Sequence, residues 1–374
     1  MKTKILFTLF LLIALWACKS ESKQTNGTAS IDLSELSTPS FYDYFSRMDV
    51  IPLETNDSSL VNNVDKIVHR NNKFYIMDVK ARRIAVFDDN GKYLREINRC
   101  GPGPGEYTDL RDFGFNEFTG ELELLSPMSG ILRYDSTGSE FKGKIHLPEG
   151  VPAVHYFQPL EKGVYLLFSQ SKPGKKLLVY DAEHNKVLSE MYDIPKFILF
   201  STVYHHVYTP FYMFENQLHF VQGYNGDVFT IGKDGMELKY HWNFGEQNFS
   251  IEGLPEHDVK YYLKYANTTG AQYANAFTEY GENSRYYMTV FLYAKDNVTL
   301  IYDKQQKKTV VFNKFREGDW TNLQFMDEQA AYGYLNPGWP FTSKIIESMD
   351  ASFKEKFKQM KPEDNPYIVK CTFK

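Results

Sequence analysis

The chain has 374 residues and a formal charge of −5, because 47 acidic residues outnumber 42 lysines and arginines. With 24% charged and 16% aromatic residues, it does not have the composition of a disordered protein. The acidic balance argues against a nucleic-acid partner, and three cysteines are too few for a disulfide framework. The length suits two or three ordinary domains, or one closed β architecture.

An export signal is predicted at the N-terminus. Two lysines precede Ile5–Trp16, a run of 12 uncharged, mostly apolar residues that is too short to span a bilayer. The run ends in Leu-Trp-Ala-Cys at positions 15–18, which resembles a bacterial lipobox. The resemblance implies a lipoprotein signal peptide over residues 1–17 and lipidation of Cys18 after cleavage. The alternative is an ordinary secretory signal with a cysteine there by chance.

Residues 18–40 are polar and rich in Ser and Thr, so we expect a flexible tether. The lipid would be the contact with the membrane. In lipoproteins, retention at the inner membrane usually uses Asp after the lipidated cysteine. Lys19 occupies that position here, so the resemblance implies an outer-membrane location, on its periplasmic or cell-surface side.

An internal repeat follows the tether. An apolar strand ending in an aromatic residue, then a turn, begins at Ile84, Ile131, Leu177, Val228 and Thr299. The first four units are spaced by 47, 46 and 51 residues, near the size of a propeller blade, and a longer gap of 71 residues precedes the fifth. An Asp at the first turn position can accept backbone N–H groups, and a Gly at the last tolerates positive φ.

Each repeat is preceded by another strand, so each unit should supply at least three strands. The preceding strands are predicted over Lys73–Val79, Glu121–Ser126, Gly163–Ser169, Gln217–Gln222 and Arg285–Leu292.

A propeller must close, because open sheet edges promote aggregation. Arg47–Glu54 and Pro366–Lys374 are both strand-like and lie near opposite ends of the chain, so together they should complete a sixth blade. Residues 41–374 are therefore predicted to be an all-β fold, a six-bladed β-propeller whose last blade joins N- and C-terminal strands. Small helices are expected at Asp258–Tyr265, inside an insertion, and at Ser343–Met360, packed on the body.

The sequence Gly-Pro-Gly-Pro-Gly-Glu-Tyr at residues 101–107 is more specific than the repeats. It resembles the G-x-G-P-G-E-[FY] signature of the six-bladed β-propeller lipoproteins of Gram-negative anaerobes, distant relatives of NHL-repeat proteins. The resemblance implies fold and envelope location, but no catalytic residues, because the family has no agreed activity. Physically, the glycines allow a tight crossing between blades, and Glu106 can accept backbone N–H groups within it.

No nucleophile elbow, H-E-x-x-H, C-x-x-C or P-loop motif occurs, so no catalytic residues are assigned. We expect a binding module with no cofactor and no assigned metal site. The alternative is a calcium-dependent lactonase or hydrolase that uses the central channel. Its E-G-P-x-W motif is absent, although Asp78 and Asp227 could supply carboxylates. Capping of turns, or lining of a wet channel, is the simpler role for both.

Candidate binding residues are histidines and exposed aromatic residues. His205 and His206 form the main histidine cluster, although neighbours on a strand face opposite sides and do not readily share one ion. Tyr261, Tyr262 and Trp339 suit a carbohydrate or peptide ligand, or an envelope protein. Because propellers bury many aromatic residues between blades, core packing is nevertheless the favoured expectation for the aromatic residues of this region, which also include Tyr265, Tyr273, Tyr280, Tyr286 and Tyr287.

A disulfide between Cys100 and Cys371 is conceivable, since blade 1 should lie beside the closing blade and the envelope is oxidising.

Overall fold

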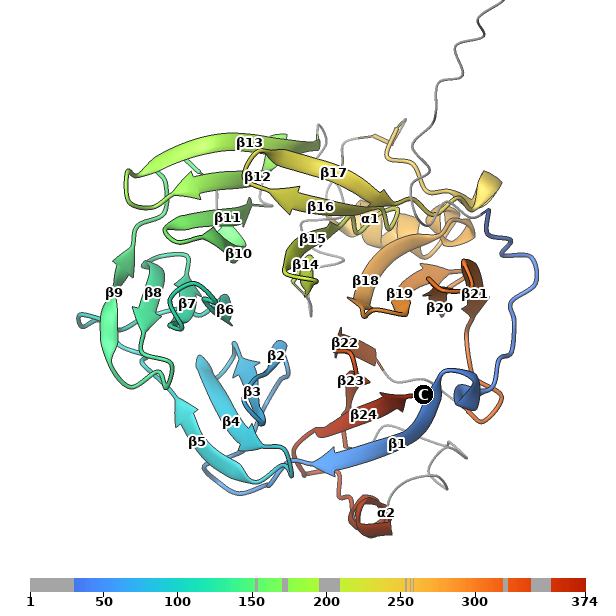
Figure 1. Ribbon diagram of the computed structural model, residues 1–374, viewed down its shortest axis with the longest axis horizontal. Coiled ribbons are helices and arrows are strands. Elements are labelled where there is room, and N and C mark those ends of the chain that lie inside the picture. The colour runs from blue at the N-terminus through green and yellow to red at the C-terminus, as the bar shows by residue number, and fades with distance from the viewer. Residues whose placement is uncertain are drawn as a thin grey trace, which may run out of the picture.

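The computed structural model describes residues 30–151, 154–169, 174–194, 209–252, 254–255, 257, 259–318, 322–337 and 351–374. These residues form six four-stranded antiparallel sheets around a central axis, a six-bladed β-propeller (Figure 1). The predicted fold class is confirmed, and each unit has one strand more than the three that the repeat required.

Blades 1 to 3 are continuous in sequence, and each runs from its innermost to its outermost strand. Blade 1 contains β2 (Lys66–His69), β3 (Lys73–Asp78), β4 (Arg83–Asp88) and β5 (Tyr93–Ile97). Blade 2 contains β6 (Asp112–Phe115), β7 (Leu122–Ser126), β8 (Gly130–Tyr134) and β9 (Phe141–Ile145). Blade 3 contains β10 (Val154–Glu161), β11 (Val164–Ser169), β12 (Gly174–Asp181) and β13 (Lys186–Ile194).

Blades 4 and 5 follow the same order, whereas blade 6 combines both ends of the chain. Blade 4 contains β14 (Phe211–Phe214), β15 (Gln217–Val221), β16 (Val228–Gly232) and β17 (Gly235–Tyr240). Blade 5 contains β18 (Asn275–Glu282), β19 (Tyr286–Tyr293), β20 (Asp296–Asp303) and β21 (Lys308–Phe312). Blade 6 contains β22 (Asn322–Met326), β23 (Ala330–Leu335), β24 (Tyr367–Phe373) and, outermost, β1 (Phe45–Pro52).

The predicted closure is confirmed by the pairing of β1 with β24. The two strands run antiparallel, with Val50 opposite Val369. Successive side chains of β24 pack against different blades: Val369 lies in the cluster shared with blade 5, and Ile368 in the cluster shared with blade 1. Burying each such side chain contributes about 1.5–3 kcal/mol, so both neighbours hold the last blade in place.

The core consists of six apolar clusters, each shared by two adjacent blades. The aromatic residues expected to pack in the core do so: Tyr280, Tyr286 and Tyr287 are all buried between blades. No sheet therefore carries its own core, and the ring folds as one unit.

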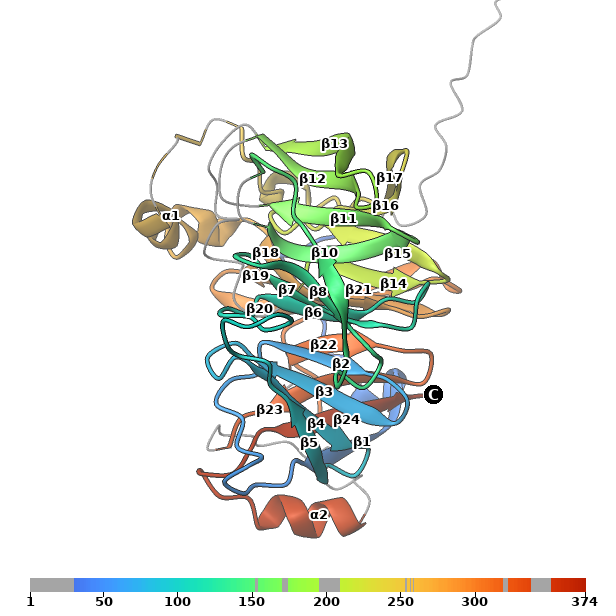
Figure 2. The same cartoon turned by 90° about the vertical axis from the view of Figure 1, so that its left-hand side faces the viewer.

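The two faces of the ring differ in their connections. On one face, here called the hairpin face, short turns join the first strand of a blade to its second, and the third to its fourth. Contacts between turns of neighbouring blades place them on the same face: Arg70 pairs with Glu117, and Ser284 N–H donates to Glu328. The opposite face, here called the loop face, carries the longer connections, and α1 projects from it (Figure 2).

The turn chemistry expected from the repeat is present. Asp88 accepts the backbone N–H groups of Asn90 and Lys92, each at 2.9 Å. Gly91 follows at φ +80°, and a Cβ there would lie 2.0 Å from the carbonyl oxygen of Pro52. The equivalent residues Asp135, Asp181 and Asp303 also accept backbone N–H groups in their turns. These turns fix the outer hairpins of blades 1, 2, 3 and 5.

Among the described residues, two α-helices lie in loop-face connections: α1 (Val259–Ala266) and α2 (Ala351–Lys358), with 3₁₀ helices at Phe41–Asp43, Gly245–Gln247 and Thr269–Gln272. The first was predicted almost to the residue. The second falls inside the predicted Ser343–Met360 helix, whose first residues lie outside the described part of the chain. Side chains of Phe353 and Phe357 pack against blade 6, as expected. Among the described residues, no helix is long and apolar enough to cross a membrane.

The end of the predicted tether is ordered against the ring, contrary to expectation. Ile31 and Leu33 are buried beside blades 4 and 5. The backbone N–H of Ile31 donates to Asn243 O at 2.8 Å, and that of Ser37 donates to Val311 O at 2.9 Å. Two apolar side chains in a polar segment were enough to fix it, so residues 30–40 act as a strap along the outer edge.

The disulfide that the sequence left open between Cys100 and Cys371 is not formed, because both cysteines are free thiols. Cys100 is exposed in the connection between blades 1 and 2. Cys371 is buried in the cluster shared by blades 5 and 6, so its side chain faces away from blade 1. Adjacency of the blades was right, but the alternation of side chains along β24 sends this one to the opposite side.

The Gly/Pro motif has the predicted structural role at the crossing between blades 1 and 2. Gly103 N–H donates to the Glu106 carboxylate at 2.8 Å. Tyr107 is fully buried, and its hydroxyl donates to Arg82 O at 2.8 Å. Tyr134 of blade 2 donates to Gly105 O, also at 2.8 Å. The motif thus ties the two blades together.

We expect Gly105→Ala to lower the free energy of unfolding by about 1–3 kcal/mol more than Gly120→Ala. Both glycines have similar positive φ values, +72° and +74°, so both variants share the cost of a left-handed backbone. Only at Gly105 would the new Cβ also meet another side chain, 2.6 Å from the Phe141 ring. Urea denaturation followed by circular dichroism measures both losses, and equal losses would contradict tight packing of the motif.

Candidate functional site

Three cavities surround the axis on the inner strands. The largest, about 580 Å³, opens between blades 2, 3 and 4 at the hairpin face. Two others have about 250 Å³ each, one beside β2, β6, β10 and β14, and one beside β2, β14, β18 and β22. Met213 lines all three. We call them the axial cavities, and the largest the hairpin-face cavity.

The hairpin-face cavity has a mostly apolar wall with exposed side chains at its rim. Phe118 and Met213, in the inner hairpins of blades 2 and 4, are 52% and 54% exposed, and both line this cavity. Leu160 and Ile231 line the cavity between them, and Gln158 contributes an amide. The strands place these residues here because the last residues of each inner strand meet at one mouth of the ring.

An ion pair links the inner strands of blades 1 and 2. Lys66 Nζ lies 2.6 Å from Asp112 Oδ1 and donates to Phe113 O at 2.7 Å. Asp112 also accepts the backbone N–H of Phe157 on blade 3, at 3.2 Å. Burial raises the pKa of Asp112, and the charge of Lys66 opposes this shift. One carboxylate therefore joins three blades at the axis.

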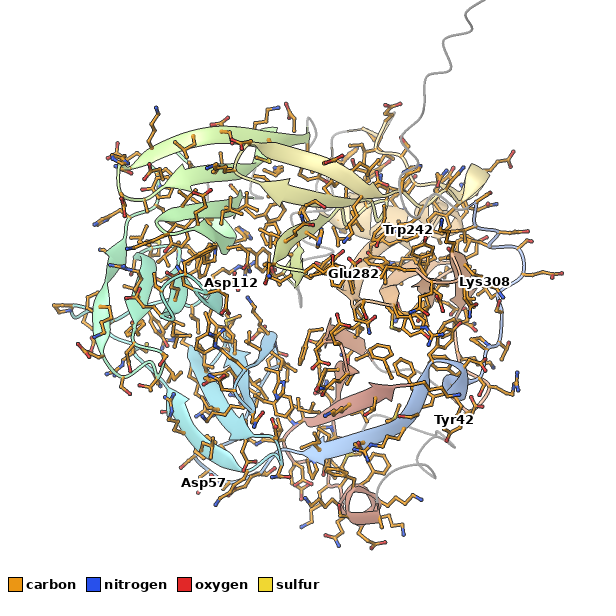
Figure 3. The ribbon with its side chains drawn as sticks, viewed as in Figure 1. Tyr42, Asp57, Asp112, Trp242, Glu282 and Lys308 are labelled. Carbon is orange, nitrogen blue, oxygen red and sulfur yellow. The ribbon has the colours of Figure 1, made fainter. Side chains whose placement is uncertain are left out.

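A second charged group lies across the axis from the first (Figure 3). Glu282, at the end of β18, has a fully buried side chain. Its carboxylate accepts from Lys239 at 2.8 Å and Lys304 at 3.0 Å, and from the hydroxyls of Tyr212 and Tyr240, both at 2.7 Å. Burial alone would raise the pKa of Glu282, but the two lysines outweigh it and hold the pKa below its ordinary value.

His219 completes this cluster at the junction of blades 4 and 5. Burial, and then the charge of Lys239, lower the pKa of His219 to about 4. The ring is therefore neutral at pH 7 and accepts from Lys239 Nζ, with Nε2 at 3.1 Å. The Phe214 ring lies under both ammonium groups, with its centroid 4.8 Å from Lys239 and 4.0 Å from Lys304.

A different set of polar groups lies toward the loop face. Arg111 lies 3.2 Å from His155 Nδ1, and burial followed by the charge of Arg111 lowers the pKa of His155 to about 4. On the other side of the ring, burial raises the pKa of Glu279 to about 8, although it accepts the backbone N–H of Leu323 at 2.6 Å. These groups stabilise the inner ends of the blades.

The two carboxylates named as calcium ligands have protein partners. Asp78 accepts from the backbone of Asn62 and Ala81, which is the turn-capping role expected of it. Asp227 pairs with His241 at 2.8 Å and with the Asn225 amide at 2.9 Å. In the described part of the chain, no group of three or more His, Cys, Asp or Glu side chains could hold a metal ion.

The binding residues proposed from sequence are only partly described. His205, His206, Trp339 and the lipidation site Cys18 lie outside the described residues, so their roles stay predictions. Tyr262 belongs to α1, but the structure does not describe its side chain, so its role also stays a prediction.

Tyr261 packs against the cluster shared by blades 3 and 4 and stacks on His257, with centroids 4.2 Å apart. Tyr261 is not one of the described residues that line the axial cavities.

Sequence reasoning missed the cavity residues themselves. Phe118 and Met213 are separated by almost a hundred residues, and Glu282 meets Lys239 across two blades. No local motif connects them. One signal could have indicated them. Each blade has a further strand before the two that were predicted, and because this strand is innermost, its residues lie near the axis.

The family and the fold can be compared with known proteins. The model of a domain of unknown function, DUF4934, matches residues 28–372. The chain belongs to this family. No match is found among curated proteins.

Among solved structures, the chain is similar to a protein of Bacteroides fragilis described as exported, with 17% identity and a TM-score of 0.67 over 93% of this chain and 98% of that one. It is also similar to a DUF4221 family member from Bacteroides vulgatus, with 12% identity and a TM-score of 0.48 over 88% and 97% of the two chains. A catalytically inactive virginiamycin B lyase from Staphylococcus aureus, in complex with quinupristin, gives 12% identity and 0.44 over 87% and 99%. At these identities the similarity concerns the fold.

We expect Glu282→Gln to lower the free energy of unfolding by about 3–5 kcal/mol at pH 7, because two lysines lose their buried counter-charge. The matched control is Glu355→Gln, which breaks an exposed pair with Lys358 and should change stability little. Because the folded-state pKa of Glu282 is depressed, its contribution is lost as the pH falls below 4.5, its ordinary value. Urea denaturation from pH 7 to pH 3 should show the wild-type and variant values converging, whereas a constant difference would contradict the charge argument.

Proposed function

We propose that the protein is a lipid-anchored binding module of the bacterial envelope, and that it holds its ligand in the axial cavities at the hairpin face. The observation that carries this proposal is the hairpin-face cavity of about 580 Å³. Small-molecule sites typically have about 300–1,000 Å³, with apolar walls and a few placed polar groups. The cavity fits both criteria.

The walls favour a preformed site. They come from the inner hairpin of blade 2, from β10 of blade 3 and from β14, β15 and β16 of blade 4, and the clusters between blades hold these sheets in place. The ion pair between Glu161 and Lys233, at 3.0 Å, joins the hairpins of blades 3 and 4 at the rim. A ligand would therefore meet walls that are already ordered, and binding would cost little conformational entropy.

The anchor is supported by the N-terminal sequence and by the strap. If Cys18 carries the lipid, the segment from Cys18 to Ser30, where the strap begins, has about twelve residues. Fully extended, it spans at most about 40 Å. This reach keeps the ring near the membrane surface, where a carbohydrate, a peptide or an envelope protein could be bound. The similarity to an exported protein agrees with this location.

We expect replacement of Cys18 by Ser to release the protein from the lipid, since the thiol is the acceptor of the diacylglyceryl group. Metabolic labelling with a radioactive fatty acid should mark the wild-type protein and leave the Cys18→Ser variant unlabelled. Mass spectrometry of the wild-type protein should find the N-terminus at residue 18. An unprocessed Met1 in exported wild-type protein would contradict the anchor, while leaving the cavity unaffected.

We expect a ligand of the cavity to raise the melting temperature, because a molecule that binds only the folded state stabilises it by about 2.7 kcal/mol at a hundred times its Kd. A thermal-shift screen of oligosaccharides and short peptides tests this with residues 28–374, which contain all six blades and both closing strands. Phe118→Ser, at the rim, should abolish the shift of a true ligand.

The control for this screen is Leu94→Ser on the outer strand β5. Leu94 is 42% exposed, close to Phe118 in exposure but remote from the axis. Compounds that stabilise Phe118→Ser and the wild-type protein equally bind elsewhere, and would contradict the proposed site.

A further inference from the structure

The axial cavities contain many charged side chains, and in the described part of the chain each one has a partner of opposite charge. The pairs are Lys66 with Asp112, Arg70 with Glu117, and Glu161 with Lys233. Glu282 has two partners, Lys239 and Lys304, so that cluster holds one positive charge in excess, but neither lysine lines an axial cavity. His69, which also lines a cavity, is hydrogen-bonded to Asp89. A site built for a charged ligand normally keeps a complementary charge available to it. Among the described residues that line these cavities, every carboxylate, lysine and arginine is already paired.

The buried ion pairs are energetically costly to separate. The side chains of Asp112 and Glu282 are fully buried, and Lys66 is only 12% exposed. Taking a partner away from a buried charge costs several kcal/mol, since the remaining charge has neither water nor a counter-ion. A charged ligand at this depth would have to break such a pair or lie unpaired beside it.

The rim pairs are weaker but do not change this conclusion. Glu161 and Lys233 are both about half exposed, at 49% and 50%. Exposed pairs contribute at most about 1 kcal/mol, so they can open to admit a molecule. When they open they release one positive and one negative charge together, and the rim stays neutral as a whole.

The remaining lining groups are uncharged. Phe118, Leu160 and Met213 supply apolar contact area, and Gln158 and Asn216 supply amide donors and acceptors. This combination matches a molecule with an apolar body and a few hydroxyl, carbonyl or amide groups.

We propose that the ligand of the axial cavities is an uncharged, amphipathic small molecule, and that the paired charges exclude anions and cations of the same size. This proposal rests on the proposed function, because it specifies the ligand class of the same site.

Three fluorescent probes test the ligand class with the protein at residues 28–374. Phenylnaphthylamine is neutral, and anilinonaphthalene sulfonate has the same aromatic skeleton with an added anionic group. Thioflavin T is an aromatic cation. We expect the neutral probe to bind at least about tenfold more tightly than either charged probe, because desolvating an unpaired charge is unfavourable. Fluorescence titration gives the three dissociation constants.

Met213→Lys provides the variant for this test. It adds one unpaired charge at the junction of the three cavities, so it should weaken the neutral probe and strengthen the anionic one. The matched control is Met128→Lys, on the β7–β8 turn at the loop face, where the methionine is 83% exposed. The control should leave all three dissociation constants unchanged.

The outcomes separate the two proposals. Equal or tighter binding of a charged probe to the wild-type protein, lost in Phe118→Ser, would overturn the neutral ligand class while leaving the site in place. Probe binding that neither Met213→Lys nor Phe118→Ser alters would show that the probes bind elsewhere, and would overturn the proposed function itself. Failure of all three probes to bind would also overturn the proposed function.

Discussion

The structure depends on one pairing, that of β1 with β24. A ring of sheets has no stable end, because each blade buries apolar side chains only against its two neighbours. Without β1, blade 6 would expose the outer edge of β24, and residues such as Val50 would leave the cluster shared with blade 5. The N-terminal strap extends the same principle, since Ile31 and Leu33 cover apolar surface at blades 4 and 5. Ends far apart in sequence thus carry the stability of the whole ring.

Closure also decides what lies at the axis. Six inner strands converge there around the axial cavities, and the apolar clusters lie between the blades instead. The polar groups of this region are therefore satisfied across blades, as Asp112 is by Lys66 and the Phe157 N–H, and Glu282 by two lysines and two tyrosines. Such bonds are directional, so they fix the angular position of each blade where apolar packing alone would tolerate sliding.

The sequence predicted the scaffold well because its signals are local. Asp88 and Gly91 specify a turn within four residues, and the recurrence of the Asp marks blades 1, 2, 3 and 5. The Gly/Pro motif likewise acts within one loop. The axial site could not be found in this way, because Phe118 and Met213 meet only after the ring has closed. Cys371 shows the intermediate case: its blade was placed correctly, but the side it faces depends on strand register, which no local signal specifies.

Local turns and ring closure together determine which side chains are exposed at the hairpin face. The inner turn of blade 2 is short, and the Asn116 side chain accepts the backbone N–H of Phe118 there at 2.9 Å, so side chains at such a turn have fixed directions. Apolar residues at those positions cannot retreat into the sheet, because the sheet faces are already filled by the clusters between blades. Met213 and Phe118 therefore stay exposed at the mouth of the ring, despite the free energy that burial would provide. Closure of the ring has fixed them there, where the apolar body of the proposed ligand would bury them.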